Sequence, residues 1–277
     1  MKKTFITLTV FLIGLGVLSY PVISDWYNTG KHYGIVSEYD EEIEKLDRER
    51  LEAEREKVQE FNQSIDPESA PLTDPFSESG GGEEVHGGYY DVLNIGEAMG
   101  YVEIDKIDVR LPIYHGTSED VLSEGAGHMS NTSLPGGGES THSVITAHRG
   151  LPSTRMFRDL DQIEIGDTFL VTTLGQTRAY EVDQVKVVLP HETEALGVVE
   201  GEEYTTLITC TPYGINTHRM LVRGHNIPYT PPVVAEEQGL GTNYSLWIIL
   251  ASSAALILYL GSKWIRRIRK GHNEEIF

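Results

Sequence analysis

The sequence lacks the residue patterns of a disulfide framework and of a metal site. It contains a single cysteine, Cys210, so no internal disulfide can form, and none of its ten histidines stands in a Cys/His spacing typical of a metal site. It also has no Gly-rich phosphate-binding motif and no internal repeat. These absences leave one thiol, which is either a small buried apolar residue, the usual role of a free cysteine, or a reactive group.

Basic residues are scarce. The chain has 22 Lys and Arg residues against 42 Asp and Glu residues, which gives a formal net charge of −20. Nucleic acids and anionic lipid surfaces are bound by basic surfaces, so neither is expected as a partner. The acidity is otherwise explained by the solubility that a high net charge gives.

Long hydrophobic runs occur near the two ends of the chain, at Thr4 to Ser24 and at Leu246 to Ser262. Each is long enough to cross a hydrocarbon core of about 30 Å, which takes about 20 residues and tolerates somewhat fewer. Basic residues precede the first run, at Lys2 and Lys3, and follow the second run between Lys263 and Lys270. The positive-inside rule therefore predicts a membrane protein with both termini in the cytoplasm and the residues between the runs outside the cell.

A cleaved signal peptide is the alternative interpretation of the first run. Its apolar stretch is longer than a signal peptide usually has, but Val17-Leu18-Ser19 would serve as a cleavage site. Both interpretations place the central region outside the cell membrane. A buried core helix is a weak alternative for the second run, because a cluster of basic residues follows it directly.

Composition divides the chain into segments of different texture. Residues 37–63 are dense in Glu, Lys and Arg around a narrow apolar stripe, which is typical of a charged helix. The next residues are rich in Pro, Ser and Gly, which indicates a long loop. The predicted boundaries are an N-terminal membrane segment at 1–24, a charged juxtamembrane helix at 25–63, a loop and Gly-rich linker at 64–90, a folded domain at 91–230, a linker at 231–245, a transmembrane helix at 246–262 and a basic cytoplasmic tail at 263–277.

From Met99 onward, short apolar stretches alternate with turns that contain Gly, Pro and Asp. Brief helical turns are expected only at 119–124 and 156–160. This pattern indicates a β-barrel or a β-sandwich. The predicted strands are 101–104, 109–114, 143–147, 168–173, 178–188, 204–210 and 219–223.

Cys210 lies at the end of a predicted strand, directly before a loop that begins with Pro and Gly, so a substrate can reach it. A catalytic thiol needs an acid/base, usually histidine, and a group that stabilises an oxyanion. His148 ends an apolar strand in the same way. Arg219 and Arg223 share one face of the strand after Cys210. A charged side chain that faces a barrel interior is costly unless it binds a charge there, so these arginines either bind such a charge or lie on a solvated face.

These residues stand in segments that resemble sortases. Thr206-Leu207-Ile208-Thr209-Cys210 matches the Thr-Leu-x-Thr-Cys signature of that family, and residues 211–224 are similar to its class C branch. Thr146-Ala147-His148-Arg149-Gly150 resembles the segment that carries the family's catalytic histidine. Residues 111–116 and 180–183 also look like sortase segments, and the similarity covers residues 97–228.

The resemblance implies a mainly β fold: an eight-stranded sortase-type β-barrel at 91–230, with an N-terminal helix and a lid loop, flanked by two transmembrane helices. It implies that Cys210 is the nucleophile, that His148 is the acid/base and that Arg219, rather than Arg223, binds the oxyanion or the substrate. Thr209 and Thr211 belong to the substrate and oxyanion region. No metal and no organic cofactor is implied.

Two further features resemble class C sortases. Asp74-Pro75-Phe76 looks like the motif of their lid, in which the aspartate engages the catalytic arginine and the aromatic residue lies by the thiol. The C-terminal membrane segment is the second feature. The stretch from Gly80 to Gly88 has no counterpart in the family and is interpreted as a flexible spacer.

The reaction implied by the resemblance is a transpeptidation. The thiol cleaves an Leu-Pro-x-Thr-Gly-like sorting signal between Thr and Gly, and the lysine of an acceptor pilin resolves the thioacyl enzyme into an isopeptide bond. The expected partners are pilin or surface-protein substrates with such signals, the acceptor lysine and the membrane. The alternatives are a sortase that anchors surface proteins to peptidoglycan, an exported cysteine hydrolase and a structural β-domain with an inert cysteine.

Overall fold

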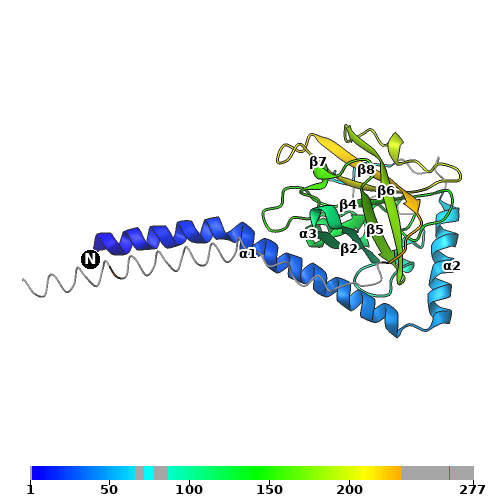
Figure 1. The fold of residues 1–277 in the computed structure, drawn as a ribbon, viewed down its shortest axis with the longest axis horizontal. Helices are drawn as coiled ribbons and strands as arrows, with labels where there is room; N and C mark the ends of the chain where they lie inside the picture. The colour runs from blue at the N-terminus through cyan, green and yellow to red at the C-terminus, as the bar shows by residue number, and fades with distance from the viewer. Residues whose placement is uncertain (1, 66–71, 78–86, 232–261, 263–277) are drawn as a thin grey trace, which may run out of the picture. The chain divides into compact units, whose positions relative to one another are not determined.

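The β-strands form a closed barrel. The computed structural model describes residues 2–65, 72–77, 87–231 and 262, and the barrel lies in a compact unit of residues 27–231 (Figure 1). The strands are β1 (Gly100–Ile104), β2 (Val109–His115), β3 (Ala126–His128), β4 (Thr141–Thr146), β5 (Thr168–Thr173), β6 (Gln176–Val188), β7 (Glu203–Thr211) and β8 (His218–Ile227). Their order around the barrel is β1-β2-β3-β4-β7-β8-β6-β5, which confirms the expected eight-stranded barrel.

The seven predicted strands are all present, and β3 is the strand that the sequence did not predict. Its three residues are too few to show a period of two, and one of them is Gly127. The helical turn expected at 119–124 is α3 (Glu119–Glu124), whereas residues 156–159 form turns. The short 3-10 helices are η1 (Tyr89–Asp91), η2 (Asp105–Ile107), η3 (Leu160–Gln162) and η4 (Glu194–Leu196).

Two helices precede the barrel, α1 (Lys2–Lys45) and α2 (Arg48–Ser64). The single charged helix expected over 37–63 is wrong, because the chain turns between these two helices (Figure 1). Asp47 has an extended backbone, and its side chain accepts a hydrogen bond from Arg50 N at 2.8 Å. This contact is an N-cap that starts a new helix.

Both helices pack on the barrel unit. Tyr39 of α1 is buried, and its hydroxyl donates to Met99 O at 3.2 Å and accepts from Leu174 N at 2.8 Å. Val58 and Phe61 of α2 are buried as well. The loop that follows α2 therefore starts from a helix that is fixed to the barrel.

Within the described residues, one helix is long and apolar enough to cross a membrane by length and composition, and it contains residues Thr9–Glu44. The same test is passed by a signal sequence, so both interpretations of the N-terminal run remain. The second apolar run, at 246–262, and the spacer at Gly80 to Gly88 fall almost entirely outside the described residues.

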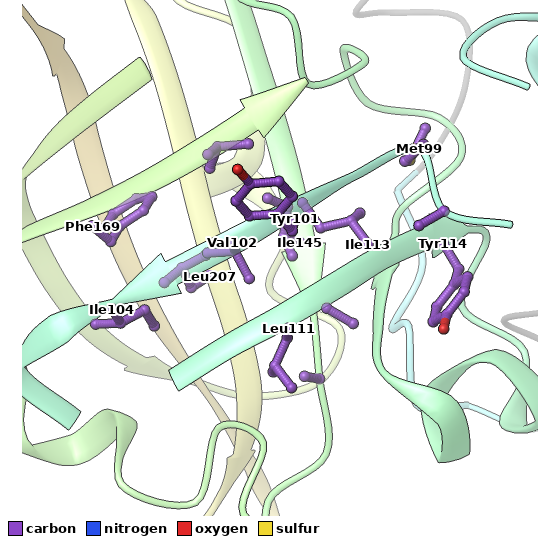
Figure 2. Packing of buried hydrophobic residues seen from close by; sticks show 14 of the residues in the cluster. Met99, Tyr101, Val102, Ile104, Leu111, Ile113, Tyr114, Ile145, Phe169 and Leu207 are labelled. Atoms are coloured by element: carbon purple, nitrogen blue, oxygen red, sulfur yellow. The ribbon is translucent and has the colours of Figure 1, made fainter. Parts of the chain in front are cut away.

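The main core fills the barrel with side chains from every second position of its strands. Val102, Ile113, Ile145 and Leu207 are fully buried. Figure 2 shows these side chains gathered between the ribbons with Leu111 and Phe169. Since successive strand residues point to opposite faces, the neighbours of Leu207 in the chain point to the other side of the barrel wall.

A smaller apolar cluster lies on that other side. It consists of the buried residues Met129, Val144, Leu196, Ile208 and Leu221, and we call it the second apolar cluster. Cys210 has the same parity in β7 as Ile208, and Arg219 has the same parity in β8 as Leu221. Both therefore belong to the face of the second apolar cluster and not to the barrel interior.

Candidate active site

The strand pairing brings the three predicted catalytic residues to one end of the barrel wall. Cys210 on β7 is the direct antiparallel partner of Arg219 on β8. β4 runs parallel to β7, with Thr146 opposite Ile208, so the two strands end at the same edge. His148 follows β4 by two residues, as Cys210 follows Ile208 by two, and the parallel register therefore places histidine and cysteine side by side.

Cys210 is buried, with 6% of its surface exposed. Burial raises the pKa of its thiol to about 11, the nearby charge of Asp74 also raises it, and the charge of Arg219 lowers it. Desolvation disfavours the thiolate and outweighs the single favourable cation. In this conformation the sulfur is a protonated thiol at neutral pH, so it needs a base before it can act as a nucleophile.

Arg219 uses all of its guanidinium nitrogens. Nε donates to Asp74 Oδ1 at 2.7 Å and Nη2 to Asp74 Oδ2 at 2.6 Å, a bidentate pair. Nη1 donates to the carbonyl oxygens of Asn216 and His218, both at 3.0 Å. The two backbone contacts fix the guanidinium at the start of β8, while the carboxylate covers its remaining donors.

His148 is enclosed on one side by the ring of Phe76, with the ring centroids 5.6 Å apart. Its Nε2 lies 3.4 Å from Glu119 Oε2, outside hydrogen-bond geometry. Glu119 begins α3 and was not among the residues predicted from the sequence. No local pattern shows that a helix beginning 29 positions earlier in the chain lies beside the histidine.

Residues 72–77 contain the motif expected to form a lid, and they pack against these side chains; we call them the lid segment. Asp74 and Arg219 have side chains that are only 11% and 10% exposed. The ring of Phe76 lies between the two predicted catalytic groups, 5.1 Å from Arg219 Cζ as well as against His148. Leu72 and Phe76 also pack on the second apolar cluster. The lid segment is thus held by one ion pair and two apolar side chains.

Thr209 and Thr211, on either side of Cys210, each use their hydroxyl group in a hydrogen bond to a residue that adjoins His148. Thr209 is fully buried, and its Oγ1 donates to Ala147 O at 2.8 Å, next to the predicted base. Thr211 Oγ1 accepts a hydrogen bond from Arg149 Nη1 at 3.1 Å. Arg149 was not predicted as a site residue; the only signal for it is its place directly after His148.

Arg223 is separate from this constellation. It pairs across the strands with Thr206, four positions from Cys210. Its Nε and Nη2 donate to Asp183 at 3.0 and 2.7 Å. Among the residues that the structure describes, no group of three or more His, Cys, Asp or Glu side chains is arranged to hold a metal ion.

Comparison with known proteins identifies the family. Residues 102–227 match the Sortase domain family. Sortase C of Streptococcus pneumoniae has a crystal structure with a TM-score of 0.66 and 45% sequence identity, and the alignment covers 72% of this chain and all of that one. The chain therefore belongs to the sortase family of cysteine transpeptidases.

Two further relatives extend the comparison. Sortase C-1 of Actinomyces oris aligns with a TM-score of 0.61 and 45% identity, over 65% of this chain and 99% of that chain. Sortase D of Bacillus subtilis (strain 168) is 33% identical over 119 residues, which is 43% of this chain and 57% of the relative. The match thus spans little more than half of that curated relative, while class C sortases are the structural neighbours over most of the chain.

Proposed function

We propose that this protein is a membrane-bound pilin-polymerising sortase, with Cys210, His148 and Arg219 as its catalytic residues and residues 91–230 as its catalytic domain. The observation that supports this most directly is the alignment of a thiol, an imidazole and a guanidinium at the ends of three adjacent strands, beside a segment that contacts the imidazole and the guanidinium. A structural β-domain with an inert cysteine would have no use for a buried arginine beside its thiol.

In the first half-reaction, Cys210 loses its proton to His148 and its Sγ bonds to the carbonyl carbon of the signal's threonine. The tetrahedral oxyanion is stabilised by Arg219 and by the backbone N–H of Thr211. The Thr–Gly bond then breaks, and His148 returns the proton to the departing glycine amine. A thioester of Cys210 with the sorting signal remains on the enzyme.

In the second half-reaction, the amine of an acceptor lysine attacks this thioester. His148 takes a proton from the amine, the new isopeptide C–N bond forms, and the thiolate of Cys210 leaves and is reprotonated. Lysine rather than water or a peptidoglycan amine is proposed as the acceptor because Sortase C of Streptococcus pneumoniae was described in connection with pilin substrate specificity.

The lid segment is proposed to keep the resting enzyme inactive. The carboxylate of Asp74 occupies the two guanidinium donors that an oxyanion would need. The ring of Phe76 takes up the space in front of His148, and the thiol is held protonated. A sorting signal can therefore bind only after the segment has moved away from Arg219.

The test uses the full chain in membranes or detergent, with a sorting-signal peptide and a lysine-bearing pilin domain. We expect a thioacyl enzyme that is visible by mass, followed by peptide–pilin isopeptide products. Cys210→Ala should abolish the acyl enzyme and His148→Ala should nearly do so. Thioacyl enzyme resolved only by water would indicate a hydrolase, and resolution only by a peptidoglycan stem amine would indicate a wall-anchoring sortase.

The proposed topology has both termini in the cytoplasm and the barrel outside the cell, with α1 as an anchor if it is not cleaved as a signal peptide. Reporter fusions at the two ends test this arrangement. A C-terminal reporter that reads as external would contradict the proposed second span, and a mature N-terminus near Ser19 would show that the first apolar run is removed.

A further inference from the structure

Two side-chain hydrogen bonds link the end of β4 to the end of β7, and they run in opposite directions. Thr209, directly before Cys210, donates to the carbonyl of Ala147, directly before His148, at 2.8 Å. Arg149, directly after the histidine, donates to the hydroxyl of Thr211, directly after the cysteine, at 3.1 Å. The two residues that flank His148 are therefore hydrogen-bonded to the two residues that flank Cys210.

Arg149 is the more unusual of the two donors, because it is a charged residue with only 7% of its side chain exposed. Its Nε donates to Arg158 O at 2.9 Å, and its Nη2 lies 2.6 Å from Asp161 Oδ2. Each nitrogen thus has a different partner, and the partners come from two separate places in the chain, residues 158–161 and Thr211. A planar guanidinium makes three such contacts at once, which a lysine ammonium on a flexible stem does not reproduce.

The contacts of Arg149 fix the loop that carries the histidine. His148 O accepts a hydrogen bond from Phe157 N at 3.2 Å, so the same stretch that binds Arg149 also holds the backbone of the histidine. The partner carboxylate of Asp161 is 53% exposed, and an ion pair with an exposed carboxylate contributes little to stability. The burial of Arg149 is better explained by what it holds in place than by that ion pair.

We propose that Arg149 is a positioning residue: through Thr211 it sets the distance and orientation between the loop of His148 and the backbone N–H that follows Cys210. This inference rests on the proposed function in one respect, since it takes that N–H as an oxyanion donor. Arg149 itself does not touch the substrate. Its guanidinium nitrogens are taken up by Thr211 and by residues 158 and 161.

The experiment compares Arg149→Ala, Arg149→Lys, Thr211→Val and Thr211→Ser in the full chain, with Arg223→Ala as a matched control. Arg223 is also a partly buried arginine paired with an aspartate, but none of its partners adjoins the thiol or the imidazole. Acyl-enzyme formation is measured per folded molecule, with kcat and KM separated. Misplacing catalytic groups by about 1 Å lowers turnover on the order of a hundredfold, so Arg149→Ala should lower kcat by about tenfold to a hundredfold and leave KM nearly unchanged.

The Thr211 variants distinguish positioning from general support of the fold. Thr211→Ser keeps the hydroxyl and should lower kcat less than Thr211→Val, which keeps the shape without the acceptor and should lower kcat as Arg149→Ala does. The double variant Arg149→Ala with Thr211→Val should be no worse than the more impaired single variant, because both remove one interaction. Additive losses, or a kcat in Arg149→Ala equal to that of Arg223→Ala, would overturn the proposal.

A second readout needs no sorting signal. In an Asp74→Ala background, where the lid segment has lost its ion pair, the rate of Cys210 alkylation by iodoacetamide is followed against pH. A histidine held beside the thiol lowers its pKa, so adding Arg149→Ala should move the profile toward higher pH while adding Arg223→Ala should not. If the chain failed to cleave sorting signals, the proposed function would fail, yet this comparison would still show whether Arg149 positions the pair; identical profiles would refute it.

Discussion

Arg219 and Arg223 stand on the same face of β8, and each forms the same kind of contact. Each binds an aspartate with Nε and Nη2, and each has its guanidinium over an aromatic ring, Phe76 for the first and Tyr204 for the second. The difference lies in where the aspartate comes from. That difference separates a contact that is proposed to open during function from one that is part of the barrel.

Asp183 is a fixed part of the barrel wall. The register between β6 and β8 shifts between Val182 and Gln184, so Asp183 is the extra residue of a β-bulge. Bulges redirect side chains, and this one presents a carboxylate to Arg223 from the adjacent strand. Asp74, by contrast, comes from the lid segment, which packs on the second apolar cluster with Leu72 and Phe76. One arginine is paired within the barrel wall, and the other is paired by a segment that is proposed to give way to a substrate.

The largest expected difference is in turnover. Arg219→Lys keeps the charge and loses the planar set of donors, and removal of one oxyanion donor lowers kcat by about 10²–10³, so we expect a loss of that order. Arg223→Lys should remain within a few-fold of the unmodified protein. Kinetics of sorting-signal cleavage check both; an essential Arg223 beside a dispensable Arg219 would contradict the proposed assignment.

A smaller effect is expected when the lid segment is weakened. A charge-assisted hydrogen bond contributes about 1.5–3 kcal/mol, and 1.4 kcal/mol corresponds to a factor of ten. Asp74→Ala and Phe76→Ala should therefore each speed labelling of Cys210 by a small thiol reagent by about tenfold or more, and raise peptide cleavage. Asp183→Ala serves as the matched control. Labelling rates unchanged in both lid variants would show that residues 64–90 are only a tether.

The pH dependence of Cys210 labelling should also differ between variants of Asp74 and variants of Asp183. Burial raises the pKa of Cys210 from about 9 to about 11, and the charge of Asp74 in the lid segment acts in the same direction. The covered state therefore holds its proton more tightly than the uncovered state, and raising the pH through this interval favours uncovering. In Asp74→Ala the midpoint of the labelling profile should move down toward the ordinary cysteine value, whereas in Asp183→Ala it should stay where it is.

The smallest effect on activity is expected at Asp183, where the change should appear in stability instead. Asp183→Asn removes the charge opposite Arg223, whose side chain is only 19% exposed. The free energy of unfolding should fall by about 1–3 kcal/mol, as for other hydrogen bonds to charged groups. Asp74→Asn should change it less, because the lid segment can detach while the barrel stays folded. Denaturant unfolding with both variants measures the contrast.

Much of this arrangement was accessible from the sequence, because it depends on local pattern. Cys210 and His148 each end an apolar strand before a turn, and that position predicts side chains that a substrate can reach at a strand edge. Their catalytic roles were implied by the resemblance to sortases. The interruption between the two helices at Asp47 also had a local signal, since an aspartate is a preferred N-cap. The continuous run of charged residues concealed it.

The rest depends on contacts between distant segments. The face to which Arg219 points follows from which strand residues fill the barrel, and this is settled only when β7 and β8 are packed. The partners of Arg149 lie up to 62 residues away in the sequence. The bulge at Asp183 interrupts a strand that reads as regular, because an extra residue changes the register without changing the composition.

The lid segment has a further consequence because it is continuous in the chain with α2, which is anchored to the barrel through Val58 and Phe61. A competitor that is tethered in this way is present at a fixed local concentration, however dilute the protein is. If the lid segment competes with sorting signals as proposed, dilution cannot release it, and the apparent affinity for every signal is reduced in proportion to the fraction of molecules that are uncovered. Such an enzyme would act mainly where its substrates are crowded together on the same membrane.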